Sequence, residues 1–187
     1  LGAREASLRP WSVQRQKDSM GGATIFDVTD RVALQVTAVV TVVLWLKMFL
    51  ASSVQGWWRF RANLRAPEDA WSGLQGEKDK GMDFARTDKP ADAATVHAIG
   101  QEQRWTRIVA NDLENIPIGL VVAWASALVA KDAVVAVHLT GLLMFGVGRL
   151  SHTVCYAIQS SKLRTNSYLL ALVGVLIMSA NLLDGVF

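Results

Sequence analysis

Four apolar blocks separated by polar stretches constrain the fold of this chain more than any other feature of its sequence. A helix needs roughly 20 apolar residues to cross a bilayer, and only helices and closed barrels satisfy their backbone polar groups there. The second and third blocks are slightly short, so their helices must continue into the polar residues beside them. The blocks cover residues 32–54, 116–130, 133–148 and 168–186.

We therefore predict an all-α fold, an integral membrane four-helix bundle in residues 31–187 preceded by a polar N-terminal extension over 1–30. Composition agrees, because 51% of residues are hydrophobic and the mean hydropathy is +0.27 although 19% are charged. The chain begins at Leu1, which suits a processed or partial sequence. The expected spans are about 31–58, 104–130, 133–158 and 166–186, with a long polar loop over 59–103.

Charge and cysteine content exclude several classes of function. The formal charge is +3, but the basic residues are mixed with acids and flank the apolar blocks, which indicates membrane-flanking charge and not a nucleic-acid surface. The single cysteine, Cys155, excludes an internal disulfide, and three scattered histidines form no zinc motif. We expect no metal site.

Polar side chains recur at helical spacing beside the second and third blocks. Arg107, Asn111 and Glu114 stand at i, i+4 and i+7, and Arg149, His152 and Tyr156 at i, i+3 and i+7, so each set shares one helix face. Buried charges cost roughly 2.5–3.5 kcal/mol each in hydrocarbon, so these faces should point into the bundle. Every span also brings an arginine to the same membrane face: Arg59, Arg104, Arg107, Arg149 and Arg164.

This excess of cations predicts a pocket for a small anion that carries carboxylates and one ammonium group. Arginine binds carboxylates through two parallel hydrogen bonds, and Glu114 can hold the ammonium. The alternative is that arginines at span ends extend to lipid headgroups and polar faces only join helices. For a single arginine that alternative is favoured, whereas two matched stripes favour the pocket. We interpret Lys47 as a packing or snorkelling residue and Cys155 as a small core residue.

Five segments resemble, in order, the MAPEG family of membrane glutathione-dependent enzymes, which includes microsomal glutathione transferases and microsomal prostaglandin E synthases. The resemblance covers roughly residues 32–186. It implies four-helix subunits assembled as a homotrimer, with glutathione bound at subunit interfaces. The segments are "LKMFLASSVQGWWR", "RAPEDA", "RTD", "NDLENIPI" and "GRLSHTVCYA".

The resemblance also implies roles for individual residues. Arg164 would lie next to the glutathione sulfur, with Thr165, Tyr156 and the loop residue Asp69 as further catalytic residues. Val109 and Ala110 depart from the family pattern, and the loop is enlarged around residues 89–103. The expected glutathione-binding residues are Arg59, Arg107, Asn111, Glu114, Arg149, His152, Tyr156, Arg164 and Tyr168.

Two functions follow from the resemblance. The first is a glutathione transferase or peroxidase of the endoplasmic reticulum or mitochondrial membrane. It would activate the glutathione thiol for attack on a lipophilic electrophile or lipid hydroperoxide that arrives from the bilayer between the first and fourth spans. The second is an accessory subunit of a larger membrane complex, for example a respiratory-chain complex, in which the extension 1–30 and the enlarged loop contact other subunits.

Overall fold

The computed structural model describes residues 31–66, 92–130 and 133–187, and confirms the all-α fold. Each of its helices is long and apolar enough to cross a membrane, so the chain is a multi-pass integral membrane protein. The extension 1–30 lies outside the described residues. The helices are α3 (Arg31–Arg61), α4 (Ala93–Val129), α5 (Ala133–Ala157) and α6 (Ser161–Val186).

The helices extend further into polar sequence than the apolar pattern predicts. α3 continues to Arg61, and α4 begins at Ala93 and not near residue 104, so helices occupy both ends of the expected loop over 59–103. α6 likewise begins earlier than expected, at Ser161 and not near residue 166. Asp92 caps α4 by accepting a hydrogen bond from the backbone N–H of Thr95 at 2.8 Å. Hydropathy could not reveal this, because the added turns are polar.

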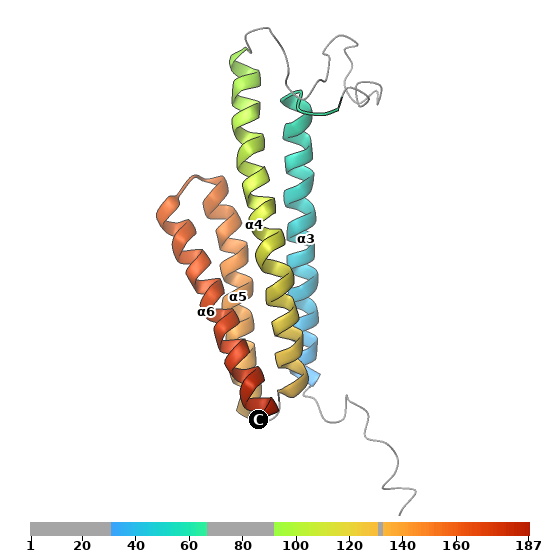
Figure 1. Ribbon diagram of the computed structural model, residues 1–187, viewed down its shortest axis with the longest axis vertical. Coiled ribbons are helices and arrows are strands. Elements are labelled where there is room, and N and C mark those ends of the chain that lie inside the picture. The colour runs from blue at the N-terminus through green and yellow to red at the C-terminus, as the bar shows by residue number, and fades with distance from the viewer. Residues whose placement is uncertain (1–30, 67–91, 131–132) are drawn as a thin grey trace, which may run out of the picture.

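α3 and α4 run side by side and extend past α5 and α6 at one end of the bundle (Figure 1). α5 and α6 form an especially close pair, in which backbone meets backbone. A Cβ at Gly174 would lie 2.5 Å from both the carbonyl oxygen of Gly141 and the amide nitrogen of Phe145, and a Cβ at Gly148 would lie 2.6 Å from the amide nitrogen of Ala171. Small residues allow such close approach between membrane helices, where packing and not water exclusion drives association.

The apolar core takes side chains from all four helices. Leu44, Ile116, Phe145 and Met178 are each at most 1% exposed and belong to one cluster. Large apolar side chains that point outward, such as Trp45 at 60% exposure, cover the faces that meet lipid. α5 packs most closely against α6, and both contact α4, so the end of α5 and the start of α6 lie beside α4, which continues past them.

A buried hydrogen-bond chain joins one residue from each helix nearer the opposite end. Thr37 donates to the carbonyl of Ala33 at 2.7 Å, so its oxygen accepts from His138 Nε2 at 2.9 Å. His138 Nδ1 then accepts from the Ser126 hydroxyl at 3.0 Å, and Ser126 accepts from Asn181 Nδ2 at 2.8 Å. This neutral chain explains His138, which the sequence pattern left without a role.

Candidate functional site

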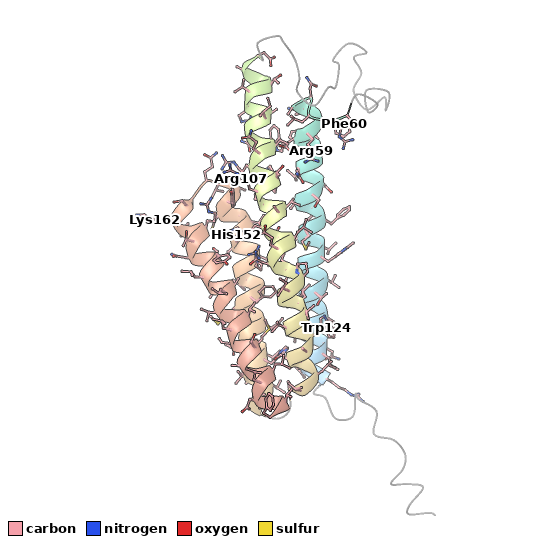
Figure 2. The ribbon with its side chains drawn as sticks, in the orientation of Figure 1. Arg59, Phe60, Arg107, Trp124, His152 and Lys162 are labelled. Carbon is pink, nitrogen blue, oxygen red and sulfur yellow. The ribbon has the colours of Figure 1, made fainter. Side chains whose placement is uncertain are left out.

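An open cleft rich in arginine lies between α4, α5 and α6 where α5 ends. Its volume is about 260 Å³. Figure 2 shows Arg107 on the side of α4 that faces α5 and α6. We call it the arginine pocket; it is lined by Gly100, Gln103, Arg104, Arg107, Tyr156 and Arg164.

Tyr156 organises two of the three cations in the arginine pocket. The Arg164 guanidinium carbon lies 4.6 Å from the centre of the Tyr156 ring, a cation–π contact. Arg104 Nη1 donates to the Tyr156 carbonyl at 3.4 Å, while Arg104 Nε is buried and has no partner among the described residues. Among the described residues, no carboxylate forms an ion pair with Arg104, Arg107 or Arg164. The pocket is therefore a site of uncompensated positive charge.

A second polar cluster lies deeper, around Arg149, which is 1% exposed. Its Nη2 donates to Asn111 Oδ1 at 2.6 Å and to Asp112 Oδ1 at 2.9 Å. Lys47 forms an ion pair with the other oxygen of Asp112. Arg149 Nε and Nη1 are buried and have no hydrogen-bond partner in the described part of the chain. This charged cluster thus holds two cations and one carboxylate, so its hydrogen-bond donors outnumber its acceptors.

Arg149 also lines a cavity of about 160 Å³ between α4, α5 and α6. Glu114 and Tyr168 line the same cavity, whose other walls are mostly apolar. His152 stands one turn along α5 from both Arg149 and Tyr156, and its ring centre lies 5.8 Å from that of Tyr156. His152 is 4% exposed, and its Nδ1 has no partner among the described groups.

The structure therefore separates the predicted ligand residues into two neighbouring sets. The arginine pocket holds Arg107, Tyr156 and Arg164. The inner cavity holds Glu114, Arg149 and Tyr168. Asn111 contacts Arg149, and His152 contacts Tyr156.

Two further predicted site residues in the described part of the chain line neither cavity. Arg59 is on α3 and forms an ion pair with Glu102 of α4 at 2.8 Å, and its side chain is 48% exposed. Thr165 is exposed and donates to the carbonyl of Ser161 at 3.1 Å, within its own helix. Asp69 lies outside the described residues.

The sequence interpretation of Lys47 as a packing or snorkelling residue was wrong. Its side chain is 9% exposed and is paired with Asp112 in the middle of the bundle. The sequence did hold a signal for this pair. A lysine in the middle of a membrane span needs a buried carboxylate, and Asp112 stands beside Asn111 on the polar part of α4. Glu102, the partner of Arg59, was also missed because it lies in the stretch expected to be loop.

Comparison with known proteins gives one family match. A family model described as the MAPEG family matches residues 37–183. No curated protein and no solved structure matches the chain significantly.

Proposed function

The chain belongs to the MAPEG family, and from that premise we propose that it is a membrane-bound glutathione-dependent transferase or peroxidase. The observation that carries the proposal is the arginine pocket at the end of the bundle. It offers three guanidinium groups that no described carboxylate neutralises. Such a site favours a polyanionic ligand.

Glutathione fits the donors and acceptors of the two cavities. It carries two carboxylates, one ammonium group and one thiol. The carboxylates match Arg104 and Arg107, whose guanidinium groups form no ion pair with a described residue. Glu114 is exposed on the wall of the inner cavity and could accept the ammonium. Arg149 lines the same cavity as Glu114, and its N–H groups without a described partner add hydrogen-bond donors there.

The reactive group supplied by glutathione is its thiol, whose pKa resembles that of cysteine at about 8.5. A nearby guanidinium favours the thiolate, which is the nucleophile. Arg164 would provide that charge, and the Tyr156 ring beneath it holds the guanidinium in place. A thiolate held there could attack an electrophilic carbon or the O–O bond of a lipid hydroperoxide. Thr165, which donates within its own helix, would need another rotamer to reach the sulfur.

We extend the proposal to a homotrimer in the endoplasmic reticulum or mitochondrial membrane. Arg59 supports an assembly of copies, because within one chain it lies on α3, away from the arginine pocket, with half of its side chain exposed. It could therefore reach a ligand held by a neighbouring copy. Asp69 keeps its proposed catalytic role as a loop residue.

The second candidate is an accessory subunit of a larger membrane complex. It is favoured by the extension of α3 and α4 beyond the other two helices (Figure 1). The Arg59–Glu102 ion pair and the contact between the rings of Trp58 and His97, whose centres are 5.6 Å apart, hold the two helices together there. A braced protrusion of this kind suits contact with another protein.

Glutathione binding and turnover test the proposal. The purified chain should bind glutathione in calorimetry, show thiolate absorbance near 240 nm, and conjugate 1-chloro-2,4-dinitrobenzene or reduce cumene hydroperoxide. Arg164→Ala should lower the thiolate signal and turnover by about tenfold or more, the range expected for loss of one stabilising charge. Lys162→Ala is the matched control, because Lys162 is an exposed cation nearby that does not line the pocket.

Two outcomes would decide against the transferase. Wild-type protein that binds no glutathione would remove its basis, and an Arg164→Ala variant that matches Lys162→Ala would remove the role of Arg164. Native size in mild detergent separates the two candidates, because a homotrimer favours the enzyme and co-migration with a large complex favours the subunit.

A further inference from the structure

A polar cleft lies beside the end of α3 and shares no lining residue with the arginine pocket or the inner cavity. Its volume is about 410 Å³, within the roughly 300–1,000 Å³ range of small-molecule sites. Figure 2 shows Arg59, one of its lining residues, at this end of α3. We call it the α3 cleft; it is lined by Ser52, Gln55, Gly56 and Arg59 of the helix and by Leu64, Arg65 and Ala66 after it.

The turn that ends α3 folds Arg65 back onto the helix. The backbone N–H of Leu64 donates to the carbonyl of Arg59 at 3.1 Å. The backbone N–H of Asn63 donates to the carbonyl of Phe60 at 3.3 Å, which completes a Schellman motif. Asn63 has a φ of 52°, the left-handed conformation that this motif requires and that asparagine tolerates. The reversal places the Arg65 guanidinium carbon 3.4 Å from the centre of the Phe60 ring, a cation–π contact.

The α3 cleft therefore contains two guanidinium groups. A Cβ at Gly56 would lie 3.9 Å from Arg65 Nη2, so the missing side chain leaves room for the guanidinium against the helix. Arg59 stands one turn further along α3, and its bond to Glu102 uses one of five N–H donors. The described charges around the cleft are thus two cations and one carboxylate. An oxyanion such as phosphate suits this arrangement, because guanidinium groups bind it through paired hydrogen bonds.

The α3 cleft lies at the depth of lipid headgroups. The apolar block of α3 ends at residue 54, and Arg59 stands about 8 Å beyond it at 1.5 Å per residue. The headgroup layer on each side of a bilayer is roughly 5–8 Å thick. Trp57, which is 48% exposed, marks the same level, since tryptophan concentrates at the membrane interface. An anion that reaches the cleft from the bilayer therefore presents a headgroup phosphate.

One face of α3 continues from the cleft into the hydrocarbon layer. The rings of Trp45 and Phe49 are stacked there with centres 5.9 Å apart, and both residues are more than half exposed. Ser52 is exposed between this ring pair and the guanidinium groups. The order of aromatic rings, hydroxyl and cations matches the order of acyl chain, ester and phosphate in a phospholipid. The face is defined by spacings of four and three residues through Trp45, Phe49, Ser52, Gly56 and Arg59.

We propose that the α3 cleft binds an anionic phospholipid of the surrounding bilayer. The phosphate accepts hydrogen bonds from Arg59 and Arg65. The ester region lies against Ser52, and an acyl chain lies over Phe49 and Trp45. A zwitterionic phospholipid would bring a cation beside two guanidinium groups, so lipids with a net negative charge bind more tightly. The proposal does not rest on glutathione chemistry, in which Arg65 has no role.

The test compares dioleoyl phosphatidate with dioleoyl phosphatidylcholine, two probes that share acyl chains and differ in headgroup charge. Binding to the purified full chain in detergent is measured by native mass spectrometry at matched concentrations. Phosphatidate should bind more tightly, and Arg65→Gln should weaken its binding about fivefold, the value of one cation near an anionic headgroup. Arg61→Gln is the matched control and should leave the affinity unchanged. Arg61 is a neighbouring exposed arginine that contacts the Trp57 ring at 4.3 Å and does not line the cleft.

Two substitutions of Gly56 locate the bound lipid. Gly56→Leu should fill part of the cleft and weaken phosphatidate binding. Gly56→Ala should retain it, because its Cβ would make only an ordinary contact at 3.9 Å. Both substitutions favour the helix over glycine, so the fold is preserved. Equal phosphatidate affinities of Arg65→Gln and Arg61→Gln, or of the two Gly56 variants, would overturn the proposal.

Two soluble anions are the competing occupants of the α3 cleft. Displacement of phosphatidate by an excess of inorganic phosphate would show that the cleft holds a soluble anion and not a lipid. The effect of Arg65→Gln on phosphatidate binding should be the same with and without saturating glutathione. Loss of that effect in the presence of glutathione would assign the cleft to the glutathione site and overturn the proposal. A chain that binds no glutathione would refute only the proposed transferase.

Discussion

Asp112→Asn should destabilise the bundle strongly. Asp112 is 1% exposed and contacts Lys47 and Arg149, one cation on each carboxylate oxygen. The wild-type charged cluster has one excess positive charge, and the substitution raises that excess to two. One additional uncompensated charge in the hydrocarbon region costs about 3 kcal/mol on insertion scales, similar to the roughly 3–5 kcal/mol for breaking a buried ion pair. We therefore expect a loss of about 3 kcal/mol in the free energy of unfolding.

The double variant Asp112→Asn with Lys47→Met distinguishes a loss of charge balance from a loss of packing. Lys47→Met removes one cation and retains the volume of the side chain, so in the Asp112→Asn background it restores the wild-type excess of one. The double variant should recover most of the loss, about 2 kcal/mol or more. A purely steric role for Asp112 predicts instead that the two substitutions add.

The assay is reversible unfolding of the detergent-solubilised chain by added SDS, followed by far-ultraviolet circular dichroism. Asp184→Asn is the control, because it makes the same chemical change at an exposed position near the end of α6. If Asp112→Asn is no more destabilising than Asp184→Asn, the buried charge of Asp112 does not stabilise the bundle. If Lys47→Met adds to the loss and does not reverse it, charge balance is not what Asp112 provides.

Two other substitutions test the remaining contacts within the bundle by the same assay. Gly174→Ala should lower the free energy of unfolding by about 1–3 kcal/mol, because its Cβ would meet backbone atoms of α5 at 2.5 Å. Gly100→Ala is the control: no atom lies within 4 Å of its Cβ, so it should be neutral or stabilising by up to about 1 kcal/mol. Equal effects would refute the close α5–α6 approach. Ser126→Ala should lower the free energy of unfolding by about 1–2 kcal/mol, because His138 Nδ1 and Asn181 Nδ2 both lose their partner. Ser179→Ala is the control: it removes a hydroxyl that donates to Val175 of its own helix and should cost less than about 0.5 kcal/mol. Equal costs would show that the buried hydrogen-bond chain does not stabilise the bundle.

The sequence predicted the four spans because a bilayer imposes a length and a composition on any helix that crosses it. It also predicted which residues share a helix face, since 3.6-residue spacing places Arg107 with Asn111 and Arg149 with His152. It did not predict partners across helices, because spacing along one helix contains no information about the rotation of its neighbours. Lys47 therefore appeared isolated until α3 and α4 were placed side by side with Asp112 between them. For the same reason, the sequence grouped Arg59 with the arginines of the pocket. The direction of its side chain depends on Glu102, which lies in turns of α4 that carry no apolar signal.

The buried hydrogen-bond chain around His138 and the charged cluster around Arg149 differ in a way that indicates where ligands bind. In the chain through Thr37, His138 and Ser126, each donor meets an acceptor, and Asn181 Oδ1 is its one buried oxygen that has no partner in the described part of the protein. The charged cluster around Arg149 has the opposite imbalance, with buried N–H groups left over and too few acceptors to receive them. Joining helices requires only a closed chain of hydrogen bonds, as the first group demonstrates. Retaining surplus hydrogen-bond donors at membrane depth costs stability, so the charged cluster, and not the neutral chain, is where acceptor-rich ligands should bind, with their carboxylates on the side of the inner cavity.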